Sequence, residues 1–189
     1  AIYRGADSGI LVSDRRVAGA DTLATSYALS LAVRKVGADI VFAGRQTIDG
    51  DTAHVGPQVA QALGVPQVTY AEEVTADGED HLIVKRRLDN GYEMVRTSIP
   101  AVITVMGTAA KCRPCNVRRL LEYRKADVTV WSADDLGGDV ARFGLAGSPT
   151  QVIKSEPIVT ETKGSVTLTS SDEDLTNLVN QLIANRTID

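Results

Sequence analysis

The sequence predicts an α/β protein with a doubly wound, mostly parallel nucleotide-binding sheet, an inserted antiparallel meander and an extended carboxyl-terminal arm that ends in a helix. Three observations predict this fold. Short apolar runs alternate with helical periodicity in the first third of the chain, alternating apolar and polar residues follow, and a polar stretch precedes the last helix. The 189 residues suit one domain with an appendage, which we place at 1–150 and 151–189.

The first elements alternate between apolar runs and helical spacing. Residues 9–13 and 39–43 predict buried strands. Between them, apolar residues recur at helical spacing over 21–36, where Asp21 or Thr22 can cap the helix and Gly37 ends it. A second helix is expected over 52–63. Strands and helices in this order imply parallel strands joined by right-handed crossovers.

The middle and end of the chain follow a different pattern. Residues 67–74, 81–88 and 92–99 alternate in polarity and are separated by turn sequences that favour hairpins. The remaining predicted elements are a buried strand at 101–106, a basic helix at 116–125, a strand at 128–131 and a closing helix at 172–185. Ser171 and Asp174 form a capping-box variant at the start of that helix. Residues 152–169 lack a core of their own, so we expect them to lie on another surface.

Composition excludes several classes of function. Twenty basic against 24 acidic residues give a net charge of -4, which argues against wrapping of duplex DNA. Only 4% of the residues are aromatic, so no platform for stacking single-stranded bases is expected. We find neither a membrane-length apolar run nor a leader, and expect a cytoplasmic protein without nucleic-acid or membrane partners. Because the chain opens on Ala1, we expect that an amino-terminal piece is missing.

The segment 44–58 is the most informative part of the sequence. It follows a predicted strand and opens a helix, at the sheet edge where open α/β proteins bind ligands. Its glycines let the backbone approach a bound group, and free amides at the helix start favour a phosphate. The candidate cofactor-binding residues are Gly44, Arg45, Gln46, Asp49, Gly50, Asp51, Thr52, Ala53, His54 and Val55. An Asp-Gly turn followed by a capped helix explains the spacing equally well, because the segment matches neither a GxGxxG nor a Walker motif.

A second polar segment reaches the same sheet edge. Asp14, Thr22, Thr25 and Ser26 offer polar groups to a planar ligand. Helix capping by Asp21, with Thr25 and Ser26 bonded to their own backbone, is the simpler explanation of these residue types.

Cys112 and Cys115 are the only cysteines, and their spacing is typical of redox pairs. The predicted order of elements does not match a thioredoxin-type fold. Zinc needs four ligands, and the chain has only two histidines, His54 and His81. We therefore favour chance spacing, and predict no metal site. No catalytic nucleophile–base pair stands out either, which favours a protein that binds a nucleotide or redox cofactor over a hydrolase.

The sequence resembles the electron transfer flavoprotein beta subunit over nearly its whole length. The stretches that carry the resemblance are 44–57, 63–70, 86–93, 99–105 and 133–137. The family's first strand and helix have no counterpart here. Residues 49–52 and 56–57, together with 13–15 and 19–26, are similar to the electron-bifurcating group of the family.

The resemblance implies an electron carrier, an oxidoreductase component that acts through bound flavin. Its beta site would hold FAD, with NADH as electron donor, or AMP in the non-bifurcating alternative. The implied partners are the family's alpha subunit, an acyl-CoA dehydrogenase type flavoenzyme, and ferredoxin or flavodoxin as low-potential acceptor. The family's docking loop corresponds to 111–119, with Val117 as apolar anchor beside Arg113, Asn116 and Arg118. The arm from Ser148 resembles the segment that wraps the alpha subunit. A stand-alone adenine-nucleotide-binding module is the alternative from another class.

Overall fold

The computed structural model describes residues 1–124, 128–156, 164–165 and 167–188. Two compact units make up the chain, Ala1–Gln151 and Val152–Asp189. Every buried apolar residue of the described part lies in the first unit, so the core that positions a site is found there.

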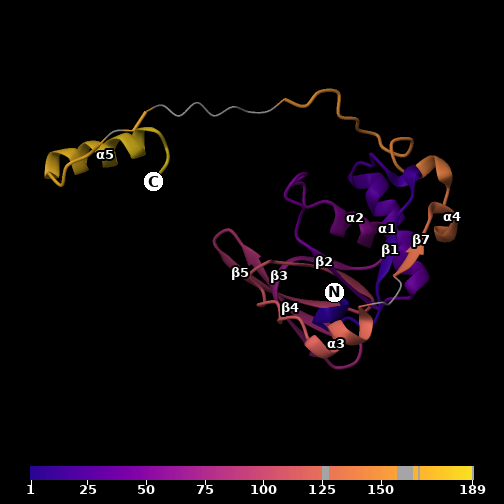
Figure 1. Cartoon of the computed structure of the whole chain (residues 1–189). Helices are drawn as coiled ribbons and strands as arrows, with labels where there is room; N and C mark the ends of the chain where they lie inside the picture. Colours follow the sequence, from indigo (N-terminus) through magenta and orange to yellow (C-terminus); the bar gives the residue numbers. More distant parts are fainter. Residues whose placement is uncertain (125–127, 157–163, 166, 189) are drawn as a thin grey trace. The chain divides into compact units, whose positions relative to one another are not determined.

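The first unit is a mixed α/β structure, as the sequence predicts (Figure 1). A two-stranded parallel sheet pairs β1 (Ile10–Val12) with β7 (Thr129–Trp131). A five-stranded sheet has the order β2-β6-β3-β4-β5. Its strands are β2 (Ile40–Gly44), β3 (Gln67–Asp77), β4 (His81–Leu88), β5 (Gly91–Ser98) and β6 (Ala101–Val105). Strands β2, β6 and β3 run parallel, and β3-β4-β5 form the predicted antiparallel meander.

The helices begin and end at residues that the sequence marks clearly. Helix α1 (Thr22–Val36) starts after Asp21, whose Oδ1 accepts hydrogen bonds from Leu23 N and Ala24 N, both at 3.0 Å. Gly37 ends it in a left-handed conformation. The other helices of this unit are α2 (Val55–Leu63), α3 (Val117–Tyr123), α4 (Ala133–Leu136) and the short 3-10 turns η1 (Ile2–Arg4), η2 (Arg15–Val17) and η3 (Val140–Arg142).

Three small apolar clusters hold the unit together. One joins the meander to β6 through Val68, Ala71 and Ile103. A second packs α2 on the sheet, and a third packs α1 against α4, where Phe143 is buried. Figure 1 shows α1 and α2 side by side. A Cβ on Gly56, near the start of α2, would lie 3.7 Å from the Ala43 Cβ, so the start of α2 lies close to the carboxyl end of β2.

The prediction that the first two strands are buried is wrong for both. Leu11 in β1 is 52% exposed and Phe42 in β2 is 58% exposed. Each strand lies at the edge of its sheet, with a neighbour on one side only within the described residues. A largely apolar hollow of about 320 Å³ lies between these edges, lined by residues that include Ile10, Phe42 and Trp131.

The second unit contains α5 (Asp172–Ala184), which begins at the predicted residue. Ser171 caps it, and its hydroxyl accepts a hydrogen bond from Asp174 N at 3.2 Å. The capping box is only half formed, because the Asp174 carboxylate accepts a hydrogen bond from Thr169 N at 2.9 Å instead of returning to Ser171. No helix in the described part of the chain has both the length and the apolar character needed to cross a bilayer. The predicted arm and basic helix lie partly outside the described residues, at 157–163, 166 and Lys125.

Candidate nucleotide site at the carboxyl end of β2

The loop between β2 and α2 adopts an uncommon backbone conformation. Asp51 and Ala53 have φ angles of 50° and 54°, a left-handed region that side chains other than glycine rarely enter. Such residues cost free energy and persist where the surrounding structure fixes them, which is frequent at ligand sites. Helix α2 starts at Val55, three residues later than predicted, because these two residues cannot be helical.

Free amides gather where the loop enters α2. Among the residues that the structure describes, the N–H groups of residues 52–56 donate no hydrogen bond, and Pro57 has no N–H. His54 occupies the N-cap position, but its side chain caps no amide. Unpaired amides and the positive end of the helix dipole together favour an anion at this place.

A cavity of about 250 Å³ opens between the loop and the end of β2. Seven of the predicted cofactor-binding residues line it, namely Gly44, Arg45, Gln46, Thr52, Ala53, His54 and Val55. Leu29, Ala43, Thr47 and Gly56 complete the lining. Leu29 belongs to α1, and only the packing of α1 beside the loop brings it here, so no local sequence signal could have found it.

The acidic residues at the tip of the β2–α2 loop, Asp49 and Asp51, form hydrogen bonds within the loop. Hydrogen bonds from the Thr47 side chain and from the amides of Asp49 and Gly50 lower the pKa of Asp49 below its usual range. The Gln46 amide donates to the Asp51 carboxylate, and Asp51 N donates to Thr47 O at 3.1 Å. Asp49, Gly50 and Asp51 do not line the cavity, and their contacts hold the loop in shape.

The second predicted segment serves packing in this structure. Asp14 accepts hydrogen bonds from Arg16 and from Ala133 N, which joins η2 to α4. Ser26 is buried between α1 and α2, where its hydroxyl lies 2.9 Å from Gln58 Oε1 and donates to Thr22 O at 2.6 Å. Neither these two residues nor Thr22 and Thr25 line the cavity. Their predicted contact with a flavin therefore stays a prediction.

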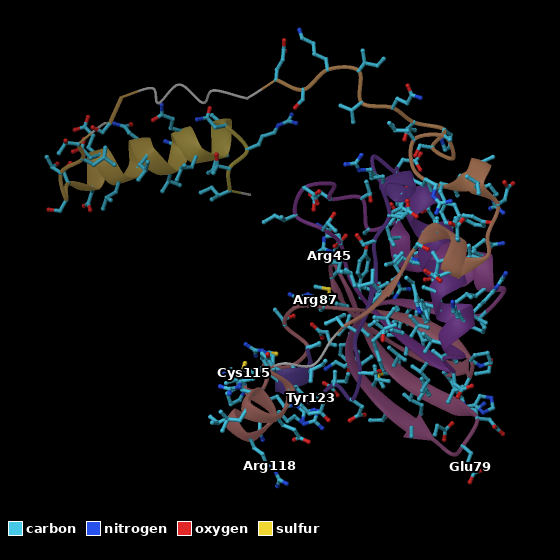
Figure 2. All side chains as sticks on the ribbon, turned by 45° about the vertical axis from the view of Figure 1, so that its right-hand side comes forward. Arg45, Glu79, Arg87, Cys115, Arg118 and Tyr123 are labelled. Atoms are coloured by element: carbon cyan, nitrogen blue, oxygen red, sulfur yellow. The ribbon has the colours of Figure 1, made fainter. Side chains whose placement is uncertain are left out.

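A larger cavity, of about 440 Å³, adjoins the first through Arg45. Tyr70, Arg87, Leu88, Asp89 and Met106 also line it. The Arg45 guanidinium lies 5.3 Å from the centre of the Tyr70 ring, and Tyr70 itself has a φ of 59°. Figure 2 shows Arg45 and Arg87 on the same side of the molecule. No sequence pattern predicted this cavity, because its residues come from β3, from the end of β4 and the turn after it, and from the positions just after β2 and β6.

The predicted docking residues lie together at the start of α3. Val117 is 70% exposed, and Arg113 and Arg118 are exposed beside it. The Asn116 side chain has a structural task, since its Oδ1 accepts a hydrogen bond from Arg119 N at 3.2 Å and caps the helix. Figure 2 shows Arg118 and Tyr123 projecting from this segment. Within the described residues no three metal-ligating side chains come together.

Comparison with known proteins decides the family. Residues 1–136 match the electron transfer flavoprotein domain. The chain belongs to the electron transfer flavoprotein family. It is 44% identical over 166 residues to the electron transfer flavoprotein subunit beta of Clostridium acetobutylicum, a match that covers 88% of this chain and 64% of that protein. The beta subunit of Thermoanaerobacterium thermosaccharolyticum is 44% identical over 183 residues, or 96% of this chain and 70% of that protein.

A third relative in this family carries a more specific name. The caffeyl-CoA reductase-Etf complex subunit CarD of Acetobacterium woodii is 41% identical over 152 residues, which covers 80% of this chain and 58% of that protein. The chain thus spans roughly 58% to 70% of the length of these three relatives. The resemblance seen in the sequence, to electron transfer flavoprotein beta subunits, is confirmed.

Proposed function

We propose that the chain acts as an electron transfer flavoprotein beta subunit that binds FAD at the β2–α2 loop. In this proposal electrons enter from NADH and leave toward an acyl-CoA dehydrogenase type flavoenzyme and a low-potential acceptor such as ferredoxin or flavodoxin. A bound flavin would supply the electron chemistry, and the chain would supply position and electrostatics.

The observation that carries the proposal is the set of free amides at the start of α2. Within the described part of the chain the N–H groups of residues 52–56 donate no hydrogen bond, and the loop that presents them is strained at Asp51 and Ala53. A diphosphate satisfies such amides and gains from the helix dipole. Arg45 lines the same cavity and adds a positive charge. Asp49 and Asp51 do not line the cavity, so their negative charges do not face the space that a phosphate would occupy.

The size of the cavity limits what it can hold. At about 250 Å³ it lies below the range of roughly 300 to 1,000 Å³ typical of sites that enclose a whole drug-sized ligand. In our proposal the cavity takes the adenosine and phosphate part of the dinucleotide, and the remainder extends outside. AMP has the same adenosine and phosphate groups, which makes the non-bifurcating beta subunit with AMP the second candidate.

The docking segment supports the proposed electron-transfer partner. Val117 is exposed together with Leu120 and Leu121, which follow it three and four residues later on α3. Such an exposed apolar face, next to the exposed Arg113 and Arg118, suits a transient anchor in a partner's pocket. One relative is named as a subunit of a caffeyl-CoA reductase-Etf complex, which supports a partner that acts on CoA thioesters.

Identifying the nucleotide released when the native complex is denatured tests the proposal directly. We expect two FAD molecules per complex with the alpha subunit and no AMP. One FAD together with one AMP would leave the beta subunit without flavin, and would favour the second candidate. A complex that releases neither from this chain contradicts both.

A pair of arginine variants tests the place of binding. Arg45→Gln removes a charge that lines the 250 Å³ cavity, and Arg87→Gln removes one that lines only the neighbouring cavity. Hydrogen bonds to charged groups are worth about 1.5 to 3 kcal/mol, so Arg45→Gln should weaken nucleotide binding on the order of 10- to 100-fold. Arg87→Gln should change it little. Equal losses in both variants would place the phosphates outside the β2–α2 loop.

A further inference from the structure

The two cysteines lie outside both cavities described above, on the exposed loop between β6 and α3. Cys112 and Cys115 are both free thiols and both exposed. Figure 2 shows Cys115 on this loop beside α3. The sequence favoured chance spacing for the pair, but the surroundings that the fold gives them are not those of two inert thiols.

A guanidinium lies directly against one of the sulfur atoms. Arg4 Nη1 donates a hydrogen bond to Cys112 Sγ at 2.9 Å and a second one to Arg113 O at 2.7 Å. The thiolate is the form of cysteine that attacks a disulfide, and a neighbouring arginine stabilises its negative charge. No such contact reaches Cys115 within the described residues. Cys112 is therefore the sulfur in direct contact with a positively charged side chain, and Cys115 follows it three residues later in the chain.

The loop also borders a positively charged hollow of about 340 Å³. Its lining residues among those described are Arg4, Gly5, Arg113, Pro114, Cys115, Asn116 and Arg119, a set with three arginines and no carboxylate. Arg119 is engaged, because it donates to Ala6 O at 2.8 Å and lies 3.5 Å from the exposed Asp7 carboxylate. Arg4 and Arg113 form no ion pair in the part of the chain that the structure describes.

The position of Arg113 is fixed by the backbone of the amino-terminal segment. A Cβ on Gly5 would lie only 3.0 Å from Arg113 Nη1, so the guanidinium rests against this glycine. Asn116 N donates to Tyr3 O at 2.8 Å and ties the loop to the same segment. Arg4, which contacts Cys112 Sγ, and Arg113, which lines the same hollow as Cys115, thus bring positive charge to the cysteine loop, where they attract an anion.

We propose that Cys112 and Cys115 form a thiol–disulfide exchange site for anionic disulfides of low molecular weight. The Cys112 thiolate attacks one sulfur of the disulfide, a mixed disulfide forms, and the first thiolate of the reagent leaves and takes up a proton. The Cys115 thiolate then attacks Cys112 Sγ and releases the second thiol. The two protein thiols are oxidised to one disulfide, and the reagent is reduced to two thiols. This site needs neither the nucleotide nor an electron-transfer partner, so it goes beyond the proposed function.

Comparing two disulfides of opposite charge tests the proposal. The fully reduced chain is mixed with oxidised glutathione, which is anionic, or with cystamine, which is cationic, and intact mass and free thiols are followed over time. We expect a product lighter by two hydrogen atoms, formed on the order of ten times faster with glutathione disulfide at low ionic strength. At about 1 M salt, where screening extends only about 3 Å, this advantage should largely vanish.

Variants separate the two roles of the arginines. Arg113→Gln, which removes charge without touching a sulfur, should slow only the reaction with glutathione disulfide. Arg4→Gln should slow the reactions with both reagents, because it also removes the hydrogen-bond donor to Cys112. Cys115→Ser should stop at the mixed disulfide, and Arg15→Gln, which removes an exposed arginine that does not line the hollow, should change neither rate.

Two results would overturn the proposal. One is a chain with both cysteines intact that accumulates mixed disulfides without closing to the internal disulfide. The other is that oxidised glutathione and cystamine react at equal rates and that no arginine variant changes either rate. The cysteines would then react as exposed thiols without help from the arginines.

Discussion

At the scale of single residues, one arginine between two carboxylates ties distant segments together. Arg16 Nη2 lies 2.7 Å from Asp14 Oδ2, and Arg16 Nη1 lies 2.7 Å from Asp134 Oδ1. Asp14 also accepts a hydrogen bond from Ala133 N at 3.0 Å. Hydrogen bonds from the Arg16 side chain and from the Arg16 and Ala133 amides hold the pKa of Asp14 well below its usual range. The carboxylate proposed in the sequence as a ligand contact is thus a link between η2 and α4.

This link predicts a specific loss of stability in acid. A carboxyl group whose pKa is lowered in the folded state stabilises the fold fully above its unfolded pKa of about 3.9, and the contribution fades as the pH falls toward the folded value. Asp14→Asn should therefore lower the urea midpoint at pH 7, and the gap to the unmodified chain should narrow below about pH 4. Urea midpoints measured from pH 7 to pH 2 check this.

The control for this measurement is Glu79→Gln at the exposed turn between β3 and β4, which Figure 2 shows at the edge of the molecule. Its midpoints should follow those of the unmodified chain at every pH. A constant gap between Asp14→Asn and the unmodified chain down to pH 2 would mean that the charge of Asp14 does not carry the effect.

At the scale of elements, the candidate site depends on how closely α2 approaches β6. A Cβ built on Gly56 would lie 2.3 Å from Thr104 Cγ2, which no relaxed structure tolerates. Thr104 is 1% exposed, and its Oγ1 accepts a hydrogen bond from Tyr70 N at 3.0 Å, so it cannot turn away without breaking that bond. Gly56 is therefore required for the close packing of α2 on β6.

Substituting this glycine should destabilise the fold in a way that a second substitution repairs. Gly56→Ala forces an overpacked contact, for which about 1 to 3 kcal/mol of unfolding free energy is the usual loss. Thr104→Ser removes Cγ2 and keeps Oγ1, so the double variant should recover most of that loss. Gly107→Ala, where a Cβ meets nothing within 4 Å, is the matched control. Denaturant unfolding compares five chains, namely the unmodified chain, the two single variants, the double variant and the control, and additive losses in the double variant would refute the contact.

Local signals in the sequence predicted the elements well, and tertiary packing explains where they fell short. Caps such as Asp21 and Ser171 and the turn residues of the meander placed α1, α5 and β4 almost to the residue, because these signals act over a few bonds. The burial of β1 depends on which strands pair beside it. Helix α2 does not start at 52 as predicted, because Asp51 and Ala53 have positive φ angles that their residue types do not indicate. The cavity beside Arg87 gathers side chains from β3, from β4 and from the residues that follow β2 and β6, so spacing along the chain does not reveal it.

At the scale of the whole molecule, the two units differ in how they are stabilised. The buried apolar residues of the described chain run from Ala24 to Phe143, within the first unit. Helix α5 buries none of its own residues. Leu175, Val179 and Ile183 follow one another at a spacing of four residues and are 46% to 50% exposed. A helix of this length is marginal alone in water, so this apolar stripe is suited to a partner surface.

Removing the second unit separates stability from assembly. A chain that ends at Gln151 keeps every buried apolar residue of the described part, so its free energy of unfolding should stay within about 0.5 kcal/mol of that of the full chain.

If the stripe on α5 contacts the alpha subunit, as we propose from the family resemblance, the double variant Leu175→Asp and Val179→Asp should weaken that association. Burial of one such side chain is worth about 1.5 to 3 kcal/mol, which predicts a loss on the order of 10- to 100-fold for each. Asn177→Asp places the same charge about half a turn away on α5 and should leave the affinity unchanged, because it lies off the stripe. Titration of the alpha subunit with these chains measures the affinities, and equal losses for Asn177→Asp and the stripe variants would assign the effect to charge on the arm instead of to the apolar face.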